Sequence, residues 1–326
     1  MCTHITLKEN NNIIAARTMD FSFQLDPEFV FTPRKHKLSF EHYRSDLEDH
    51  KAFLGLSKNL GSYKMADGIN EDGLSCAALY FEGYASYNKE VIDKSINLRP
   101  DEFLHWILAY NSSVEDLLAK LEGINLIEGE IAFIGKTPPL HWVVSDTKGK
   151  SIIIEPRDKK LLVYENQVGV LTNSPDYEWH ITNLRNYIGI DMNQVHERKI
   201  GNLLLEPFGQ GSGTFGLPGD YTPPSRFVRA SFNRLAATYS KENEDLLSTA
   251  IHVLNTVSIP KGSVVTQRKT IDYTQYTSYM DLTNKIYYFK TYDNQNIYAE
   301  KMGDYDLTSS DLVVKKLSGT MDYLSL

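Results

Sequence analysis

The alternation of apolar and polar side chains at the start of the chain predicts a β-hairpin. Residues 2–8 alternate with the two-residue period of a strand, and residues 13–18 supply the returning strand. The consecutive asparagines between them suit a turn, because Asn tolerates positive φ. Cross-strand neighbours lie about 5 Å apart, so this hairpin should bring Cys2, Arg17 and Asp20 together at one end.

The rest of the chain shows helix and strand patterns in blocks. An S-x-x-E capping pattern at Ser112 and Glu115 predicts where the second of four helices begins. The helices are expected at 100–110, 113–122, 225–240 and 242–257. Strands are expected at 52–57, 74–81, 141–146, 151–155, 161–164, 168–172, 263–267, 271–280 and 284–291. Because these blocks do not follow a regular βα alternation, they favour a layered α+β fold.

The composition is that of an ordinary globular protein, and it narrows the possible partners. The chain has 326 residues and a net charge of −8, which argues against a nucleic acid or an anionic membrane surface as the main partner. No apolar run is long enough to span a membrane, and the first residues lack the apolar core of a secretory signal. With two cysteines, a reducing cytoplasm is the expected location. Since no repeat or linker divides the chain, we expect residues 1–326 to form one domain.

Cys2 is the first candidate for chemistry. A small residue at position 2 permits removal of the initiator methionine, which would leave one residue with both a thiol and a free α-amine. An unperturbed α-amine has a pKa of about 7.7–8.0 and accepts a proton near neutral pH, so the nucleophile would carry its own base. Arg17 would stabilise the thiolate, and Asp20 would hold the amine. From position alone, a terminal cysteine without a role and a solvated Arg–Asp pair stay open as alternatives.

Motifs in a fixed order resemble the choloylglycine hydrolase family, which groups bile salt hydrolases with penicillin V acylases among the N-terminal-nucleophile amidases. They are MCT at the chain start with ARTMD at 16–20, GINEDGL at 68–74, TNSP at 172–175, GLPGDY at 216–221 with SRFVRA at 225–230, and the looser YTQYTS at 273–278. The resemblance covers essentially the whole chain. It implies a four-layer αββα sandwich, in which helix pairs flank two antiparallel sheets, and it implies a homotetramer.

The resemblance also implies a role for each matching residue. Cys2 is the nucleophile after loss of Met1, its α-amine is the base and later the acid, Arg17 lies beside the sulfur, and Asp20 positions the amine. The oxyanion hole consists of the Asn173 side-chain amide and the Tyr80 backbone N–H, and Arg226 completes the charged network. An Asn side chain supplies the N–H donor that such a role requires.

One position bears on the substrate of this expected amide hydrolysis. Bile salt hydrolases usually have Asn where this chain has Tyr80, so Tyr80 favours a penicillin V acylase that releases 6-aminopenicillanate and phenoxyacetate. Conjugated bile salts and N-acyl homoserine lactones are alternative substrates, and a non-catalytic protein that binds acyl amides is an alternative of another class. The expected pocket walls suit a phenoxyacetyl group and a steroid alike; they are Met19, Phe23, Tyr80 and Leu140.

No pattern indicates a cofactor or a metal. The nine histidines show no ligand spacing. A G-x-G-x-x-G match at 211–216 lacks the strand before it and the helix after it that a dinucleotide site requires. Cys76 lies in a strand pattern and is expected to be a buried, inert thiol. The expected partners are therefore a small acyl amide and further copies of the chain.

Overall fold

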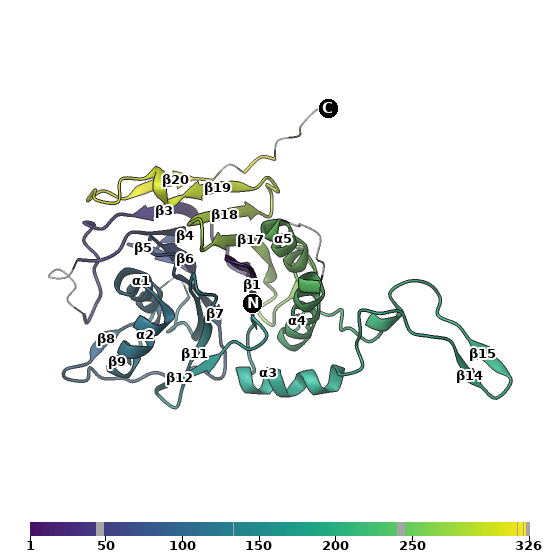
Figure 1. Ribbon diagram of the computed structural model, residues 1–326. Helices are drawn as coiled ribbons and strands as arrows, with labels where there is room; N and C mark the ends of the chain where they lie inside the picture. The colour runs from purple at the N-terminus through teal and green to yellow at the C-terminus, as the bar shows by residue number, and fades with distance from the viewer. Residues whose placement is uncertain (44–48, 133, 240–244, 318, 322, 324–326) are drawn as a thin grey trace.

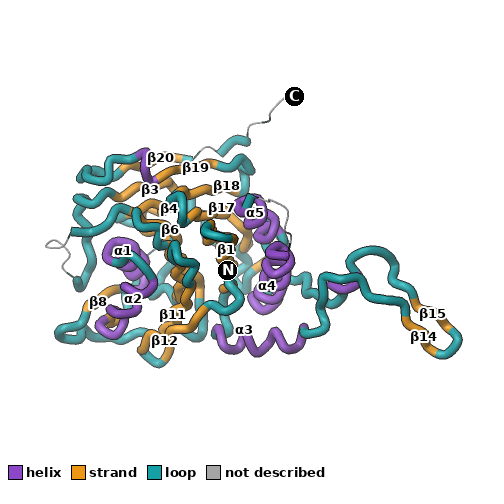
Figure 2. Tube along the Cα trace, viewed as in Figure 1, coloured by secondary structure: helices purple, strands orange, loops and turns teal. Residues whose placement is uncertain are grey.

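Two antiparallel sheets are stacked face to face, and helices cover the outer face of each sheet (Figure 1). The computed structural model describes residues 1–43, 49–132, 134–239, 245–317, 319–321 and 323. Figure 2 shows the same layers coloured by secondary structure, with the chain start at β1, beside α4. The arrangement is the four-layer αββα sandwich that the resemblance predicts.

The first sheet is built from the two ends of the chain. Over the described residues its seven strands run in the order β13–β1–β2–β17–β18–β19, with β16 beside β17. Their bounds are β1 (Cys2–Glu9), β2 (Asn12–Phe21), β13 (Val170–Leu171), β16 (Val264–Val265), β17 (Ile271–Asp281), β18 (Ile286–Thr291) and β19 (Tyr298–Lys301). The strand that begins with Cys2, β1, therefore lies between β13 and β2, and β2 separates it from β17.

The second sheet is built mainly from the middle of the chain. Over the described residues its nine strands run in the order β12–β11–β10–β7–β6–β4–β3–β20, with β5 beside β4. Their bounds are β3 (Glu28–Thr32), β4 (Phe53–Asn59), β5 (Tyr63–Met65), β6 (Asp67–Asn70), β7 (Ser75–Tyr80), β10 (Leu140–Ser145), β11 (Ser151–Arg157), β12 (Lys160–Glu165) and β20 (Val313–Lys316). A separate parallel pair consists of β8 (Ile96–Leu98) and β9 (Ile124–Leu126).

The helices form one pair on each sheet. On the second sheet lie α1 (Pro100–Tyr110) and α2 (Val114–Lys120), and on the first lie α4 (Pro223–Tyr239) and α5 (Leu246–Asn255); α3 (Tyr177–Asn183) precedes a projecting arm. Short 3₁₀ turns lie at Leu121–Gly123, Leu184–Tyr187, Ser212–Thr214 and Met302–Asp304. Residues 240 and 242–244 of the expected helices lie outside the described residues.

The start of α2 differs from the sequence expectation by one residue. Ser113 caps the helix, because its Oγ accepts the N–H of Asp116 at 3.1 Å. Ser112 instead donates its backbone N–H to the Asp116 carboxylate at 2.9 Å. Both Ser112-x-x-Glu115 and Ser113-x-x-Asp116 have the spacing of a cap, and the carboxylate that bonds back to the preceding backbone selects the second.

The first hairpin has the predicted register. Cys2 lies opposite Met19 and His4 opposite Arg17, so the numbers of paired residues sum to 21. On the other side of β2, the register with β17 shifts between Thr274 and Tyr276. A bulge of this kind changes the direction of neighbouring side chains, and it lies next to the Cys2 end of the hairpin.

The core lies between the stacked sheets. Ile5 and Leu7 of β1 are fully buried in one cluster with Leu79 of β7, Val143 of β10 and Ile153 of β11. Burial of each such side chain stabilises the fold by about 1.5–3 kcal/mol. Because these side chains fix β1 against the second sheet, its first residue has a defined position.

An arm extends away from the sandwich beyond α3 (Figure 1). Its tip is the hairpin of β14 (Arg198–Ile200) and β15 (Leu203–Leu205). Several apolar side chains of the arm are exposed, among them Ile188, Phe208 and Phe215. Among the described residues, no helix combines the length and the apolar character that a membrane crossing requires.

Candidate active site

Cys2 and Arg17 meet at the open end of the first hairpin. Arg17 Nη2 donates to Cys2 Sγ at 2.6 Å, and both residues are buried, Arg17 fully. Burial lowers the pKa of Arg17, but the charges of Cys2, Tyr276 and the carboxylates of Asp67 and Asp20 raise it more, so the net shift is upward. The guanidinium is therefore a permanent positive charge in contact with the sulfur, and such a charge stabilises a thiolate.

A buried carboxylate that the sequence did not reveal holds Arg17 in place. Asp67 Oδ2 lies 3.5 Å from Arg17 Nη1. The Asp67 carboxylate also accepts hydrogen bonds from Tyr276 Oη at 2.9 Å, from Ser278 Oγ at 2.9 Å and from Tyr287 Oη. With these partners, Asp67 is a fully buried anion whose charge and lone pairs are compensated.

Arg17 is fixed from the backbone as well. Its Nη1 donates to the carbonyl oxygens of Ala66 and Ala78, both at 3.0 Å. These carbonyls belong to the second sheet region, while Arg17 belongs to the first sheet. The guanidinium thus spans the two sheets, and this orients its remaining nitrogen toward Cys2.

Asp20 lies at the same end of the hairpin, where two threonines hold its carboxylate. Its carboxylate accepts hydrogen bonds from Thr274 Oγ1 at 2.6 Å and from Thr18 Oγ1 at 3.1 Å. The Cys2 N–H donates to Asn173 Oδ1 at 2.8 Å rather than to this carboxylate. Asp20 approaches the chain start through its backbone oxygen, which accepts from the Met1 ammonium at 2.5 Å.

Arg226 connects the chain start to Asn173. Its Nη1 donates to the Cys2 carbonyl and to Thr3 Oγ1, both at 2.6 Å, and its Nη2 donates to Asn173 Oδ1 at 2.7 Å. Burial lowers the pKa of this arginine, and the charges of Asp20 and Cys2 oppose that shift. Because Asn173 Oδ1 is held by two donors, the amide has a fixed orientation.

The fixed amide of Asn173 directs its Nδ2 toward the end of β7. Nδ2 donates to the Tyr80 carbonyl at 2.8 Å. The N–H of Ala78 donates to Ala66 on one side of β7, and that of Phe81 donates to Pro139 on the other. Since backbone groups alternate along a strand, the Tyr80 N–H points to the same side as that of Ala78, which is the side of Arg17. The Tyr80 N–H and the Asn173 amide therefore both lie at this end of β7, on the side where Arg17 contacts the Ala78 carbonyl.

An apolar cavity of about 150 Å³ adjoins Cys2. Met19, Tyr80 and Leu140 line it, as the sequence predicts, together with Phe21 and the side chain of Met1. The structure does not bring Phe23 into this lining. The ring of Phe23 lies outside it, 5.6 Å from the ring of Phe21, with the Arg268 guanidinium 5.1 Å from its centroid.

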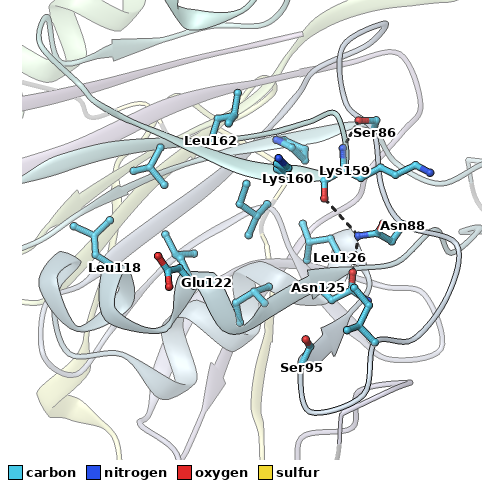
Figure 3. A pocket seen from close by; sticks show the side chains of 16 residues that line it. Ser86, Asn88, Ser95, Leu118, Glu122, Asn125, Leu126, Lys159, Lys160 and Leu162 are labelled. Atoms are coloured by element: carbon cyan, nitrogen blue, oxygen red, sulfur yellow. Dashed lines mark hydrogen bonds between the residues drawn. The ribbon is translucent and has the colours of Figure 1, made fainter.

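A larger cavity of about 620 Å³ lies elsewhere, between α2 and the edge strand β12 (Figure 3). Asn88 bonds to Asn125 and to the Lys159 carbonyl in its wall. None of the residues clustered around Cys2 lines it, so its size does not make it the site of the chemistry. Among the described residues, no cluster of His, Cys, Asp and Glu side chains could hold a metal ion.

Cys76 is the second thiol, and it takes no part in the cluster. It is fully buried between the second sheet and α1. Burial, with the nearby charge of Asp67, raises the pKa of this thiol well above its ordinary value. Cys76 is therefore a protonated and unreactive side chain, in agreement with its strand position in the sequence.

Comparison with known proteins identifies the class to which this site belongs. A profile of the linear amide C–N hydrolases of the choloylglycine hydrolase family matches residues 2–315. A bile salt hydrolase/transferase from Clostridium perfringens is 39% identical over 98% of each chain. The crystal structure of a mutant conjugated bile acid hydrolase from the same organism superposes with a TM-score of 0.94 over 100% of both chains, at 38% identity. A penicillin V acylase from Pectobacterium atrosepticum is 24% identical over 91% of this chain and 80% of that one.

The stacked sheets and the match to the conjugated bile acid hydrolase define an N-terminal-nucleophile hydrolase fold, which confirms the fold class expected from the sequence. More particularly, the chain belongs to the choloylglycine hydrolase family. It is an enzyme that hydrolyses carbon–nitrogen bonds of linear amides.

Proposed function

We propose that this enzyme hydrolyses conjugated bile salts, cleaving the amide between a steroid acyl group and its amino-acid conjugate. The observation that carries the proposal is the 39% identity to a bile salt hydrolase/transferase, against 24% to a penicillin V acylase. Conjugated bile salts, an alternative at the level of sequence, are thus better supported than penicillin V. The apolar lining of the cavity beside Cys2 is the kind of surface that steroid rings bind.

The side chain of Tyr80 is a weak guide to the substrate. The part of Tyr80 that faces Cys2 and Asn173 is its backbone, and any residue supplies the same N–H. Its ring packs edge-to-face on Phe21 with centroids 5.7 Å apart, at the wall of the cavity. A substitution there changes the wall and leaves the hydrogen-bond donors in place, so both substrate classes are compatible with tyrosine.

We propose that Met1 is removed in the active enzyme. While Met1 is attached, the nitrogen of Cys2 is a peptide N–H that cannot accept a proton, and the Met1 side chain lines the cavity next to the sulfur. Removal of one residue would provide the α-amine and enlarge the cavity at the same time. Intact-mass spectrometry of the purified protein tests this: we expect the mass of the chain from residue 2, and a retained Met1 in active enzyme would contradict it.

In the proposed reaction, the Cys2 thiolate attacks the acyl carbon and forms a tetrahedral intermediate. The oxyanion accepts hydrogen bonds from Asn173 Nδ2 and the Tyr80 N–H, and the Arg17 charge stabilises the anionic site. The C–N bond then breaks as the α-ammonium of Cys2 gives a proton to the leaving amine. Water, deprotonated by the same amine, hydrolyses the thioester and releases the acid. Asn173 Oδ1 and the neighbouring Asp20 would hold the amine through both steps.

Amine release from glycocholate and from penicillin V, measured side by side on reduced enzyme, tests the substrate. We expect faster release from glycocholate, and release from penicillin V alone would overturn the proposal. The Cys2→Ser variant keeps the size of the side chain and removes the thiol, so it should keep the fold and lose most turnover. Undiminished turnover in that variant would refute the role of Cys2.

We propose that the chain folds as one domain and forms a homotetramer through its arm. The inter-sheet core, which joins β1 to β7 and β10, supports one cooperative unit. The arm exposes many large apolar side chains, with Phe208 and Phe215 the most exposed of them, and such a grouping supports contact with another copy. Sedimentation should show a tetramer, and Phe208→Asp should shift it toward smaller species while thermal unfolding of the wild type stays a single transition.

A further inference from the structure

A second cavity, called here the polar cavity because charged and amide side chains contribute to its walls, shares residues with the apolar one, among them Met1. It measures about 540 Å³, and its walls include Asn173, Lys136 and Arg268. It shares Met1, Phe21 and Tyr80 with the apolar cavity. Cys2 thus lies near the place where the two cavities adjoin, and Met1, which we propose to be removed, is one of the three residues between them.

The chemistry of the proposed reaction decides which half of the substrate occupies each space. The leaving amine must receive a proton from the α-ammonium of Cys2, so it must lie where Met1 is now joined to that nitrogen. Met1 lines both cavities, but its ammonium lies 3.9 Å from Oδ2 of Asp272, which lines the polar cavity and not the apolar one. The acyl group then extends into the apolar cavity and the leaving amine into the polar one. This step rests on the proposed function.

The cations of the polar cavity differ in whether they already have an anionic partner. Lys136 Nζ lies 2.8 Å from both carboxylate oxygens of Glu82. Arg268 forms no ion pair with any carboxylate of the described residues; its guanidinium instead lies over the ring of Phe23, at 5.1 Å from the centroid. The ring face supports the guanidinium and leaves its N–H edge available. Arg268 is therefore the cation of this cavity that can accept a new anion.

The carboxylate of Asp272 in the same cavity indicates which end of a bound ligand carries the positive charge. Asp272 faces the chain start, since its near neighbour is the Met1 ammonium, and its charge acts on Arg226. The charge of Arg268 acts on Tyr80, at the end of β7. A leaving amine fits both charges of the cavity if its positively charged nitrogen lies near Asp272 and its anionic group lies near Arg268.

We propose that Arg268 binds the anionic end of the leaving amine, a carboxylate or a sulfonate, and so selects amides of amino acids and aminosulfonates over neutral amides. Phe23 acts as the platform for this guanidinium. Arg268 does not touch the reacting atoms; it is a specificity residue, whose effect falls on substrate binding. The proposal gives Phe23 a role on the leaving-group side in place of the expected role in the apolar wall.

The test compares two substrates that share the cholyl group and differ by one charge: glycocholate and its neutral glycinamide analogue. The variants are Arg268→Gln, Arg268→Lys and, as a matched control on the same turn, Lys269→Asn. Because the site is exposed to solvent, we expect Arg268→Gln to raise KM for glycocholate about fivefold to tenfold with kcat nearly unchanged. KM for the glycinamide should change by less than about twofold, Arg268→Lys should recover part of the loss, and Lys269→Asn should affect both substrates equally.

Each outcome decides the proposal. A loss confined to the anionic substrate supports it, and a salt-dependent KM in the wild type that becomes flatter in Arg268→Gln supports it further. Equal losses on both substrates, or no loss, overturn it. If the wild type cleaves neither cholyl amide, the proposed function fails on its own; the same comparison is then made with penicillin V and its neutral methyl ester, which again differ by a carboxylate on the leaving amine. A wild type that is silent on all four amides overturns both proposals.

Discussion

Replacing Asn173 by Asp should remove most of the turnover while preserving the fold, because it removes a donor and keeps an acceptor. Asn173 Oδ1 accepts from Arg226 Nη2 at 2.7 Å and from the Cys2 N–H at 2.8 Å, while Nδ2 donates to the Tyr80 carbonyl at 2.8 Å. A carboxylate can accept both of the first two hydrogen bonds. It has no N–H to offer to an oxyanion, and the charge of Arg226 beside it keeps it ionised.

The expected magnitudes follow from these contacts. Loss of one oxyanion donor lowers kcat by about 10²–10³, which is about 2.7–4 kcal/mol. Asn173→Ala loses the same donor but also leaves two buried donors, on Arg226 and Cys2, without an acceptor. Each unsatisfied buried group costs about 1–3 kcal/mol, so the alanine variant should lose about 2–6 kcal/mol in free energy of unfolding. The aspartate variant should be the more stable of the two and at least as inactive.

The assay pairs steady-state release of glycine from glycocholate with urea unfolding of the same preparations. The two variants should separate activity from stability, since both lose the donor and only alanine loses the acceptor. If Asn173→Asp retains more than about one tenth of the wild-type kcat, the amide is not an oxyanion donor. If the alanine variant is as stable as the aspartate variant, the accepted hydrogen bonds do not hold the site together.

Three further predictions concern stability. Asp67→Asn should lower the free energy of unfolding by about 3–5 kcal/mol, because it leaves the buried Arg17 guanidinium uncompensated. Asp72 is partly exposed, so the control variant Asp72→Asn should cost less than about 1 kcal/mol. Equal costs in urea unfolding would contradict the buried network around Asp67. Burial lowers the pKa of His105 to about 3, so the unfolded state binds a proton more readily than the folded state. As the pH falls below about 6.5, the free energy of unfolding should therefore decrease by up to about 1.4 kcal/mol per pH unit. In His105→Gln, the plot of unfolding free energy against pH should be flatter over this range. Gly73→Ala should destabilise the fold by about 1–3 kcal/mol more than Gly83→Ala. Both glycines have φ near +80°, but only at Gly73 would a Cβ meet a neighbouring backbone oxygen. Thermal melts of both variants check this difference.

The hairpin that carries Cys2 was predictable because it is local. The strand period and the position of the asparagine turn set which residues face each other, and the register of Cys2 with Met19 follows from them. Arg17 comes next to the sulfur for the same reason, and the contact of 2.6 Å agrees with the expectation from the pattern. The sites of the main helices followed equally from capping and periodicity, with the start of α2 displaced by one residue.

Other parts of the site depend on contacts between segments that are far apart in the chain. No sequence motif singled out Asp67, because most aspartates are exposed. Only the stacking of the two sheets makes this first residue of β6 a buried partner of Arg17. The bulge in β17 turns Tyr276 toward that carboxylate. The acceptor of the Cys2 peptide N–H, Asn173 Oδ1, also comes from a distant segment, and Arg226 fixes its orientation.

The sequence by itself determined the nucleophile candidate, the hairpin that carries it, the α+β class and, through its ordered motifs, the family. These properties depend on residue type and on spacing within one segment, where chain connectivity limits the possible geometry. The tertiary structure alone decided which donors converge on Cys2, which carboxylate balances Arg17, and that Phe21 rather than Phe23 lines the apolar cavity. Such contacts join strands from different sheets, and their distances depend on how the sheets stack, which no local pattern encodes.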